Sequence, residues 1–143
     1  LSMFDFDNTL VETPYEDSTY LDTKDSLDPK KWDFTFNKET LKKYFSESNE
    51  KKVITVLLTN RIGSVEDEVM SILKTKNINF NEKLFIVGKD GNRSKGKRVE
   101  SLIKKYPETT EIEYWEDKDK HIDDVISYCM KYPKIKLKIN KVI

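Results

Sequence analysis

The chain has 143 residues, a length that fits one domain, and its 26 basic and 26 acidic side chains give a formal net charge of zero. This balance does not indicate a globally basic nucleic-acid-binding protein, although it leaves room for a local basic patch. Seven Phe, seven Tyr and two Trp provide the aromatic side chains of a folded core, which long disordered chains usually lack.

The single cysteine and the short apolar runs exclude further classes of protein. Cys129 has no partner for an intramolecular disulfide, and the chain has no cysteine cluster for structural zinc. No apolar run approaches the roughly 18–20 residues that a membrane-spanning helix needs. The first residues, Leu1 to Phe4, are too few and too uncharged for a signal peptide. We therefore expect a soluble protein of the cytoplasm.

Five short apolar runs are predicted to be strands. The first, Ser2–Phe6, is brief, whereas Val53–Leu58 is a continuous β-branched and Leu run that is typical of a strand buried on both faces. Leu84–Val87 and Ile112–Trp115 are two further candidates. Ile135–Ile139 alternates strictly between apolar residues and Lys, which favours an edge strand.

Four amphipathic segments alternate with the later strands and predict helices. They are Lys38–Ser48, Ser64–Lys76, Lys95–Tyr106 and His121–Tyr132, and each repeats its apolar residues with a period near 3.6. Ser64 is a plausible N-cap of the second helix. Strand followed by helix, repeated, implies right-handed crossovers and a parallel sheet with helices on both faces. The expected fold is therefore a three-layer, doubly wound (Rossmann-like) α/β domain.

The segment Val11–Phe36 fits neither period. It contains two Pro and many Asp, and also five aromatic residues, Tyr15, Tyr20, Trp32, Phe34 and Phe36. One interpretation is a long surface loop, and the other is a flap folded over a site. Loops of this length in a compact domain are usually functional or disordered, and the aromatic residues favour the functional flap.

Polar residues follow the first four predicted strands, at the edge where open parallel α/β sheets bind ligands. In strand order they are Asp5, Asp7, Asn8 and Thr9; Thr59, Asn60 and Arg61; Lys89, Asp90 and Gly91, then Arg93, Lys95 and Lys97; and Glu116, Asp117, Asp119 and His121. Gathered carboxylates repel one another unless a cation lies between them, and oxygen ligands favour Mg²⁺. A nearby Lys and hydroxyl would then contact phosphoryl oxygens, so the pattern predicts a magnesium-dependent phosphoryl-transfer site.

The same four groups resemble, in order, the four motifs of the haloacid dehalogenase-like (HAD) phosphatase superfamily. Asp5 to Thr9 is similar to motif one, DxDxT, and Thr59 to Arg61 is similar to motif two, often written Thr-Gly-Arg. Ser94 to Lys97 resembles motif three, a Lys that opens a helix, and Trp115 to Asp117 resembles motif four. A lone DxDxT arises easily by chance, but four motifs at the correct strand ends are specific. The resemblance spans nearly the whole chain.

A narrower resemblance rests on three markers. Thr13-Pro14 soon after motif one, Trp32, and His121 after the Glu-Asp pair look like the Swiss Army Knife RNA repair-like branch of the superfamily.

The superfamily resemblance implies a role for each motif residue. Asp5 would be the nucleophile that forms an aspartyl-phosphate intermediate, and Asp7 the general acid and then base. Thr59 would hydrogen-bond a phosphoryl oxygen, helped by backbone N–H groups such as that of Asn60, which stands where the family often has Gly. Lys95, followed by Gly96 at a helix start, is the favoured motif-three lysine.

Several assignments stay open at this stage. Lys97 is the alternative to Lys95 and would contact the substrate phosphate or be a solvated surface charge. Arg61 would orient a loop, contact the substrate phosphate or be a solvated surface charge. The Mg²⁺ ligands implied are Asp5, Asp7 through its backbone carbonyl, and Asp117, with Glu116 second to Asp117. Asp119 and His121 lie near the place of a further family acid. A second interpretation of the basic residues is a patch for a polyanionic substrate, formed by Arg93, Lys95, Lys97 and Arg98.

The sequence thus predicts one HAD-like phosphohydrolase domain over residues 1–143, with the flap at 11–36 and no large cap. An open site suits large phosphorylated substrates, such as nucleic-acid termini, as well as nucleotides, and the flap aromatics could stack on a base. The alternative is a non-catalytic nucleic-acid- or protein-binding domain that retains the HAD fold.

Overall fold

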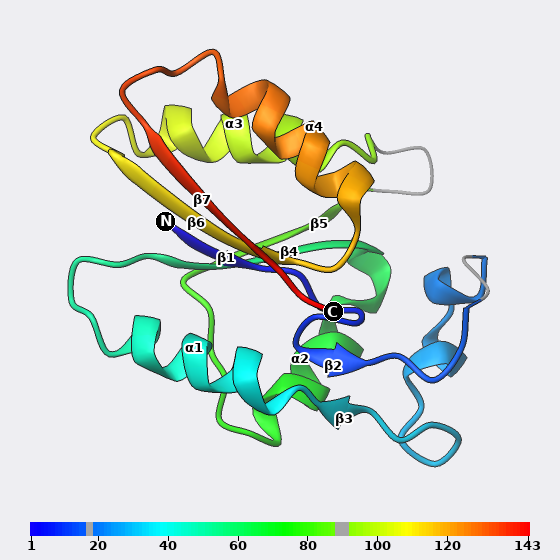
Figure 1. The fold of residues 1–143 in the computed structure, drawn as a ribbon. Helices are drawn as coiled ribbons and strands as arrows, with labels where there is room; N and C mark the ends of the chain where they lie inside the picture. The colour runs from blue at the N-terminus through cyan, green and yellow to red at the C-terminus, as the bar shows by residue number, and fades with distance from the viewer. Residues whose placement is uncertain (17–18, 88–91) are drawn as a thin grey trace.

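The computed structural model describes residues 1–16, 19–87 and 92–143, so Lys89, Asp90 and Gly91 after the third predicted strand lie outside the described residues. A five-stranded parallel sheet lies at its centre, in the order β5-β4-β1-β6-β7 (Figure 1). The strands are β1 (Ser2–Phe4), β4 (Thr55–Ile62), β5 (Glu82–Ile86), β6 (Glu111–Glu116) and β7 (Lys136–Lys141). The chain adds β4 and β5 on one side of β1 and then β6 and β7 on the other. The strand order therefore reverses beside β1, which is where doubly wound sheets form ligand sites.

Two helices cover each face of the sheet (Figure 1). Helices α1 (Lys38–Ser48) and α2 (Glu66–Lys74) lie on one face, and α3 (Lys95–Lys105) and α4 (Asp119–Cys129) on the other. The three-layer α/β prediction is confirmed. The described residues form no second, cap-sized unit, and none of their helices is long and apolar enough to cross a membrane.

The hydrophobic core has two halves because successive strand residues point to opposite faces. In β1, Phe4 packs with the α1 and α2 side and stacks on Trp115, with ring centroids 4.3 Å apart, whereas Met3 packs with the α3 and α4 side. Both side chains are fully buried. This burial on two faces explains why β4 contains the continuous apolar run Val56 to Leu58 rather than an alternating pattern.

Most predicted boundaries differ from the structure by one to four residues, and the differences in the second strand and in two helices matter for the site. The second predicted strand, Val53–Leu58, is displaced toward the C-terminus as β4, so that Thr59, Asn60 and Arg61 belong to the strand itself. The second helix begins at Glu66, after a 3-10 turn, and the Ser64 N-cap prediction is wrong because Val65 occupies that position without a side-chain cap. Helix α4 begins two residues before His121, and α1 has its predicted bounds.

The predicted flap is closed at its base by a small ribbon. Strand β2 (Val11–Glu12) pairs antiparallel with β3 (Thr35–Phe36), and the 3-10 helices Tyr20–Asp22 and Lys24–Leu27 lie between them. Figure 1 places the flap beside the carboxyl ends of the sheet strands. Tyr15, Tyr20 and Trp32 pack edge to face, with centroids 5.0–5.9 Å apart, so these rings form a cluster of their own.

Candidate active site

A tight turn after β1 presents the first acidic residues. The backbone N–H groups of Thr9, Leu10 and Val11 all donate to the carbonyl of Phe6. The turn requires a left-handed residue, and Asn8, with φ of 58°, provides it at lower cost than most side chains would. Its Oδ1 also accepts the N–H of Thr13 at 3.0 Å. This local geometry holds Asp5 at the end of β1, next to β6.

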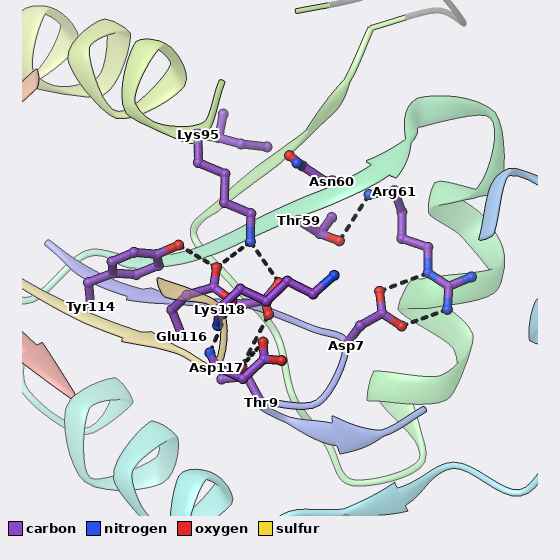
Figure 2. Close-up of polar contacts among 12 residues, drawn as sticks. Asp7, Thr9, Thr59, Asn60, Arg61, Lys95, Tyr114, Glu116, Asp117 and Lys118 are labelled. Atoms are coloured by element: carbon purple, nitrogen blue, oxygen red, sulfur yellow. Dashed lines mark hydrogen bonds and ion pairs between the residues drawn. The ribbon is translucent and has the colours of Figure 1, made fainter. Parts of the chain in front are cut away.

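A buried lysine joins the ends of three elements. Lys95 Nζ, at the start of α3, lies 2.8 Å from Asp5 Oδ1. It also lies 2.6 Å from Glu116 Oε1 at the end of β6, a contact that Figure 2 shows. The Lys95 side chain is 1% exposed. Isolated buried charges are strongly unfavourable, so this ion-pair network constrains the relative positions of the three elements.

Glu116 has donors for both carboxylate oxygens. Oε1 accepts from Lys95 and from the Tyr114 hydroxyl at 2.5 Å, and Oε2 accepts the backbone N–H groups of Asp117 and Lys118 at 3.0 and 3.2 Å. Burial alone would raise the pKa of Glu116, but the charge of Lys95 and side-chain hydrogen bonds with Asp5, Asp117 and Lys95 lower it below its ordinary value. Glu116 therefore carries the negative charge that balances Lys95.

Asp5 and Asp117 share a weaker donor. The hydroxyl of Thr9 lies 3.1 Å from Asp5 Oδ2 and 3.3 Å from Asp117 Oδ1. Burial raises the pKa of Asp5 well above its ordinary value, against the opposing effect of Lys95. Burial and then the neighbouring Glu116 raise the pKa of Asp117 to about 6. The end of β6 thus holds more carboxylate than its cations neutralise.

This excess of carboxylate fits a bound cation. Oxygens of Asp5, Glu116 and Asp117 all lie within 4.8 Å of one another. Because the oxygens of Glu116 already have four donors, the residues with free ligating capacity are Asp5 and Asp117. A set made only of oxygen ligands suits Mg²⁺.

The second carboxylate of motif one points away from this cluster. Asp7 Oδ2 accepts from Arg61 Nε at 3.0 Å and Oδ1 from Arg61 Nη2 at 2.7 Å, a bidentate pair (Figure 2). Thr13 Oγ1 adds a hydrogen bond of 2.6 Å to Oδ1. Arg61 is buried and paired, so it is neither a solvated surface charge nor a lining residue of the pocket beside the site.

The end of β4 is held in place by Arg98 from α3. Its guanidinium donates to the carbonyl of Thr59 at 2.6 Å and to Oδ1 of Asn60. Thr59 Oγ1 accepts the N–H of Arg61 at 3.1 Å. Hydrogen bonds from α3 and from within β4 therefore hold motif two in place, and Thr59 is completely buried.

The alternative basic patch does not form as a surface. Lys95 is buried with Asp5 and Glu116, and Arg98 donates to the backbone of β4, so only Arg93 and Lys97 are exposed. Lys97 is not among the residues that line the pocket beside the site. Asp119 is exposed and pairs with Lys141 at 2.8 Å.

A pocket of about 410 Å³ opens beside the cluster. Three cations, Arg93, Lys118 and Lys120, and two carboxylates, Asp22 and Asp124, contribute to its lining beside Asn60 and His121. Burial, followed by the charge of Lys95, lowers the pKa of His121 to about 4. His121 is therefore neutral near pH 7, and the cations of the lining outnumber its carboxylates by one.

A larger pocket, of about 800 Å³, lies at the opposite edge of the sheet and is lined by residues such as Leu1, Lys52 and Thr110. It contains none of the motif residues. The amino ends of parallel strands are not where doubly wound sheets bind ligands, so we place the candidate site at the smaller pocket.

Tyr114 was absent from the sequence prediction, and Arg98 was expected only as part of the alternative basic patch. Tyr114 lies two residues before Glu116 on the same face of β6, and that spacing of two was a signal for their contact. Arg98 lies one helical turn after Ser94, but its contact with β4 depends on how α3 packs across the sheet. No local pattern predicts such a contact.

Comparison with known proteins decides the family. Residues 6–143 match the family model described as HAD domain family 1 in Swiss Army Knife RNA repair proteins. The chain belongs to this HAD family. The match confirms both the superfamily resemblance and the narrower one to the Swiss Army Knife branch.

A solved structure shares the HAD fold. A chain of the "Structure of Pnkp1/Rnl/Hen1 complex" superimposes with a TM-score of 0.70 at 12% sequence identity. The likeness covers 99% of the present HAD domain and 44% of that chain, so the domain spans less than half of its neighbour's length. At this identity the likeness shows the fold. No curated protein sequence matches the chain.

Proposed function

We propose that this HAD domain is a magnesium-dependent phosphomonoester hydrolase with Asp5 as its nucleophile. The observation that carries the proposal is the buried Lys95, which pairs with both Asp5 and Glu116 beside Asp117. Burying this many charges stabilises a fold poorly in comparison with apolar packing, so such a cluster at a strand end favours a catalytic role.

In the proposed reaction, one carboxylate oxygen of Asp5 attacks phosphorus. The bond from phosphorus to the leaving-group oxygen breaks, and that oxygen takes a proton from Asp7. Water then attacks the aspartyl-phosphate, gives a proton to Asp7 and releases inorganic phosphate and free Asp5. Mg²⁺ held by Asp5, the backbone carbonyl of Asp7 and Asp117 would neutralise charge on the phosphoryl oxygens.

The binding groups for the phosphoryl oxygens are proposed on the same basis. Lys95 Nζ, which touches Asp5, and the hydroxyl of Thr59 would contact them together with backbone N–H groups at the end of β4. Asn60 and Arg93 line the neighbouring pocket and would contact the remainder of the substrate.

The substrate class we propose is the phosphorylated end of a nucleic acid or a nucleotide. Two observations support it: the family is described by its occurrence in RNA repair proteins, and Arg93, Lys118 and Lys120 line the pocket beside Asp5. Cations placed this way favour substrates that carry further phosphates.

The test is magnesium-dependent release of phosphate from a generic aryl phosphate. Asp5→Asn should lower the rate by about a thousandfold or more, because it removes the nucleophile. Asp119→Asn, an exposed acid paired with Lys141, is the matched control and should keep the activity. Full activity in Asp5→Asn, or activity unaffected by chelation of Mg²⁺, would contradict the proposal.

One observation favours a second candidate, a non-catalytic binding domain. Both carboxylate oxygens of Asp7 are engaged by Arg61, as a structural ion pair would be. A panel of 3′- and 5′-phosphorylated oligonucleotides, nucleotides, sugar phosphates and phosphopeptides separates the two candidates. Absence of turnover on every member, together with retained RNA binding, would establish the binding domain.

A further inference from the structure

Arg61 connects the flap to Asp7. All five N–H donors of its guanidinium have acceptors, and two of them serve Asp7. The other three serve the flap: Nη2 donates to the Tyr15 hydroxyl at 2.8 Å, and Nη1 donates to Ser26 Oγ at 2.8 Å and to the carbonyl of Leu21 at 3.2 Å. Arg61 is 1% exposed, so water does not compete for these donors.

The two flap hydroxyls are oriented to accept from Arg61. The Tyr15 hydroxyl donates its own proton to the carbonyl of Ser26 at 2.6 Å. Ser26 Oγ likewise donates to the carbonyl of Thr23 at 2.6 Å, within a fully buried residue. Because each proton is committed to the flap backbone, the lone pairs of both oxygens face the guanidinium.

The partners of the Asp7 carboxylate come from the same assembly. Oδ1 accepts from Arg61 and from Thr13 at the base of the flap, and Oδ2 accepts from Arg61. The direction in which Asp7 points therefore depends on where the flap holds Arg61. A carboxyl group that transfers a proton needs such fixed geometry relative to the leaving-group oxygen.

We propose that Tyr15 and Ser26 are positioning residues for proton transfer by Asp7, acting through Arg61. The inference rests on the proposed function, since Asp7 is the acid of that reaction. It makes the flap part of the catalytic geometry instead of only a cover over the site. Neither hydroxyl touches the acidic cluster of Asp5, Glu116 and Asp117.

The dependence on the leaving group distinguishes positioning from a purely structural role. A dinitrophenolate leaves without a proton, whereas phenolate and alkoxide leave with one, so a misplaced acid slows only the latter. The test is therefore to measure kcat/KM on dinitrophenyl, nitrophenyl, phenyl and alkyl phosphates. This constant covers the steps up to and including departure of the leaving group.

Tyr15→Phe and Ser26→Ala are the test variants, and Tyr20→Phe is the control. Tyr20 lies in the same aromatic cluster but does not touch Arg61. The control substitution removes a flap hydrogen bond that the Tyr20 hydroxyl accepts from Trp32 Nε1. The test variants should lose about tenfold or more on phenyl and alkyl phosphates and less than about threefold on dinitrophenyl phosphate. Tyr20→Phe should match the wild-type chain across the series, and melting temperatures verify that all variants fold.

Each result decides the proposal. An active wild-type chain whose Tyr15→Phe variant loses nothing, or loses the same factor on every substrate, overturns the positioning role and leaves the phosphatase intact. A wild-type chain that hydrolyses no member of the series overturns the proposed function and the positioning role with it.

Discussion

At the residue scale, the site combines groups that burial affects in opposite directions. Glu116 stays charged because four donors surround it. Asp5 accepts from Lys95 and from the Thr9 hydroxyl, and Asp117 accepts from the same hydroxyl. The pKa values of Asp5 and Asp117 are therefore raised by burial, and the pKa of neighbouring His121 is lowered by it. Burial thus disfavours the charged forms of Asp5, Asp117 and His121 alike.

His121 gives a pH-dependent prediction. Its pKa falls from 6.5 in the unfolded chain to about 4 in the folded one, because of burial and then Lys95. The unfolded state binds the proton more tightly, so the stability that neutral His121 preserves is present above pH 6.5 and is lost as pH falls toward 4. With divalent metal ions removed by a chelator, the wild-type chain should lose more unfolding free energy between pH 6.5 and 4 than His121→Gln, as measured by the midpoints of urea denaturation.

Lys43→Gln, at an exposed residue of α1 on the opposite face of the sheet, serves as the control. It should lose stability on acidification as the wild-type chain does. Parallel pH profiles for wild type and His121→Gln would show that His121 does not titrate differently in the two states.

At the element scale, the contact between α3 and α4 brings Lys95 to the carboxylates. Ser94 caps α3 by accepting the N–H of Lys97, and Asp124 of α4 accepts from Ser94 Oγ at 2.6 Å and from the N–H of Gly96 at 2.9 Å. A Cβ at Gly96 would lie only 2.5 Å from the carbonyl oxygen of Asp124. Glycine is thus required for the close approach of the two helices that buries its neighbour, Lys95.

Gly96→Ala should therefore destabilise the protein despite the higher helix propensity of Ala. The clash with the backbone of α4 should cost about 1–3 kcal/mol of unfolding free energy, as over-packed cores do. Urea denaturation measures it, with Lys97→Ala, exposed on the same helix, as the control. A Gly96→Ala variant as stable as Lys97→Ala would show that the helices can separate at no cost.

At the scale of the whole molecule, the two halves of the core are buried on opposite faces of one sheet. Met3, Val56 and Tyr114 meet α3 and α4, while Phe4 and Leu57 meet α1 and α2. Cys129 lies in the former half, and burial raises the pKa of its thiol to about 11. Its reactivity therefore reports on the unfolding of that half.

In the folded protein near pH 8, Cys129 should react with a thiol reagent at least about a hundredfold more slowly than in denaturant, because little thiolate forms and access is blocked. A reagent that releases a coloured product on reaction with a thiol measures the rate. A control chain with Cys129→Ala and Met130→Cys moves the thiol to a residue that is 76% exposed, and it should react quickly while folded. Equal rates for the two native proteins would contradict the burial of Cys129.

Local patterns predicted most of the fold. Period 3.6 gave α1 its bounds, and uninterrupted apolar runs marked the strands that are buried on both faces. The errors lie at the ends of elements. Thr59, Asn60 and Arg61 are polar, so the apolar run that predicted the second strand stopped at Leu58, although pairing with β5 continues that strand to Ile62 and Arg98 donates to the carbonyl of Thr59. A periodic pattern in the sequence does not predict contacts between residues that are far apart along the chain.

The sequence by itself determined that this chain has a parallel α/β fold and that four polar motifs meet at the carboxyl edge of its sheet. Both follow from short-range patterns and from the rule that parallel strands end at one edge. Only the tertiary structure decided which side chains face one another there. It placed Lys95 and not Lys97 against Asp5, and it turned Arg61 toward Asp7 and the flap. These contacts depend on helix packing and on burial. A charge that is buried away from water needs an oppositely charged or hydrogen-bonding group beside it, and tertiary packing decides which groups lie there.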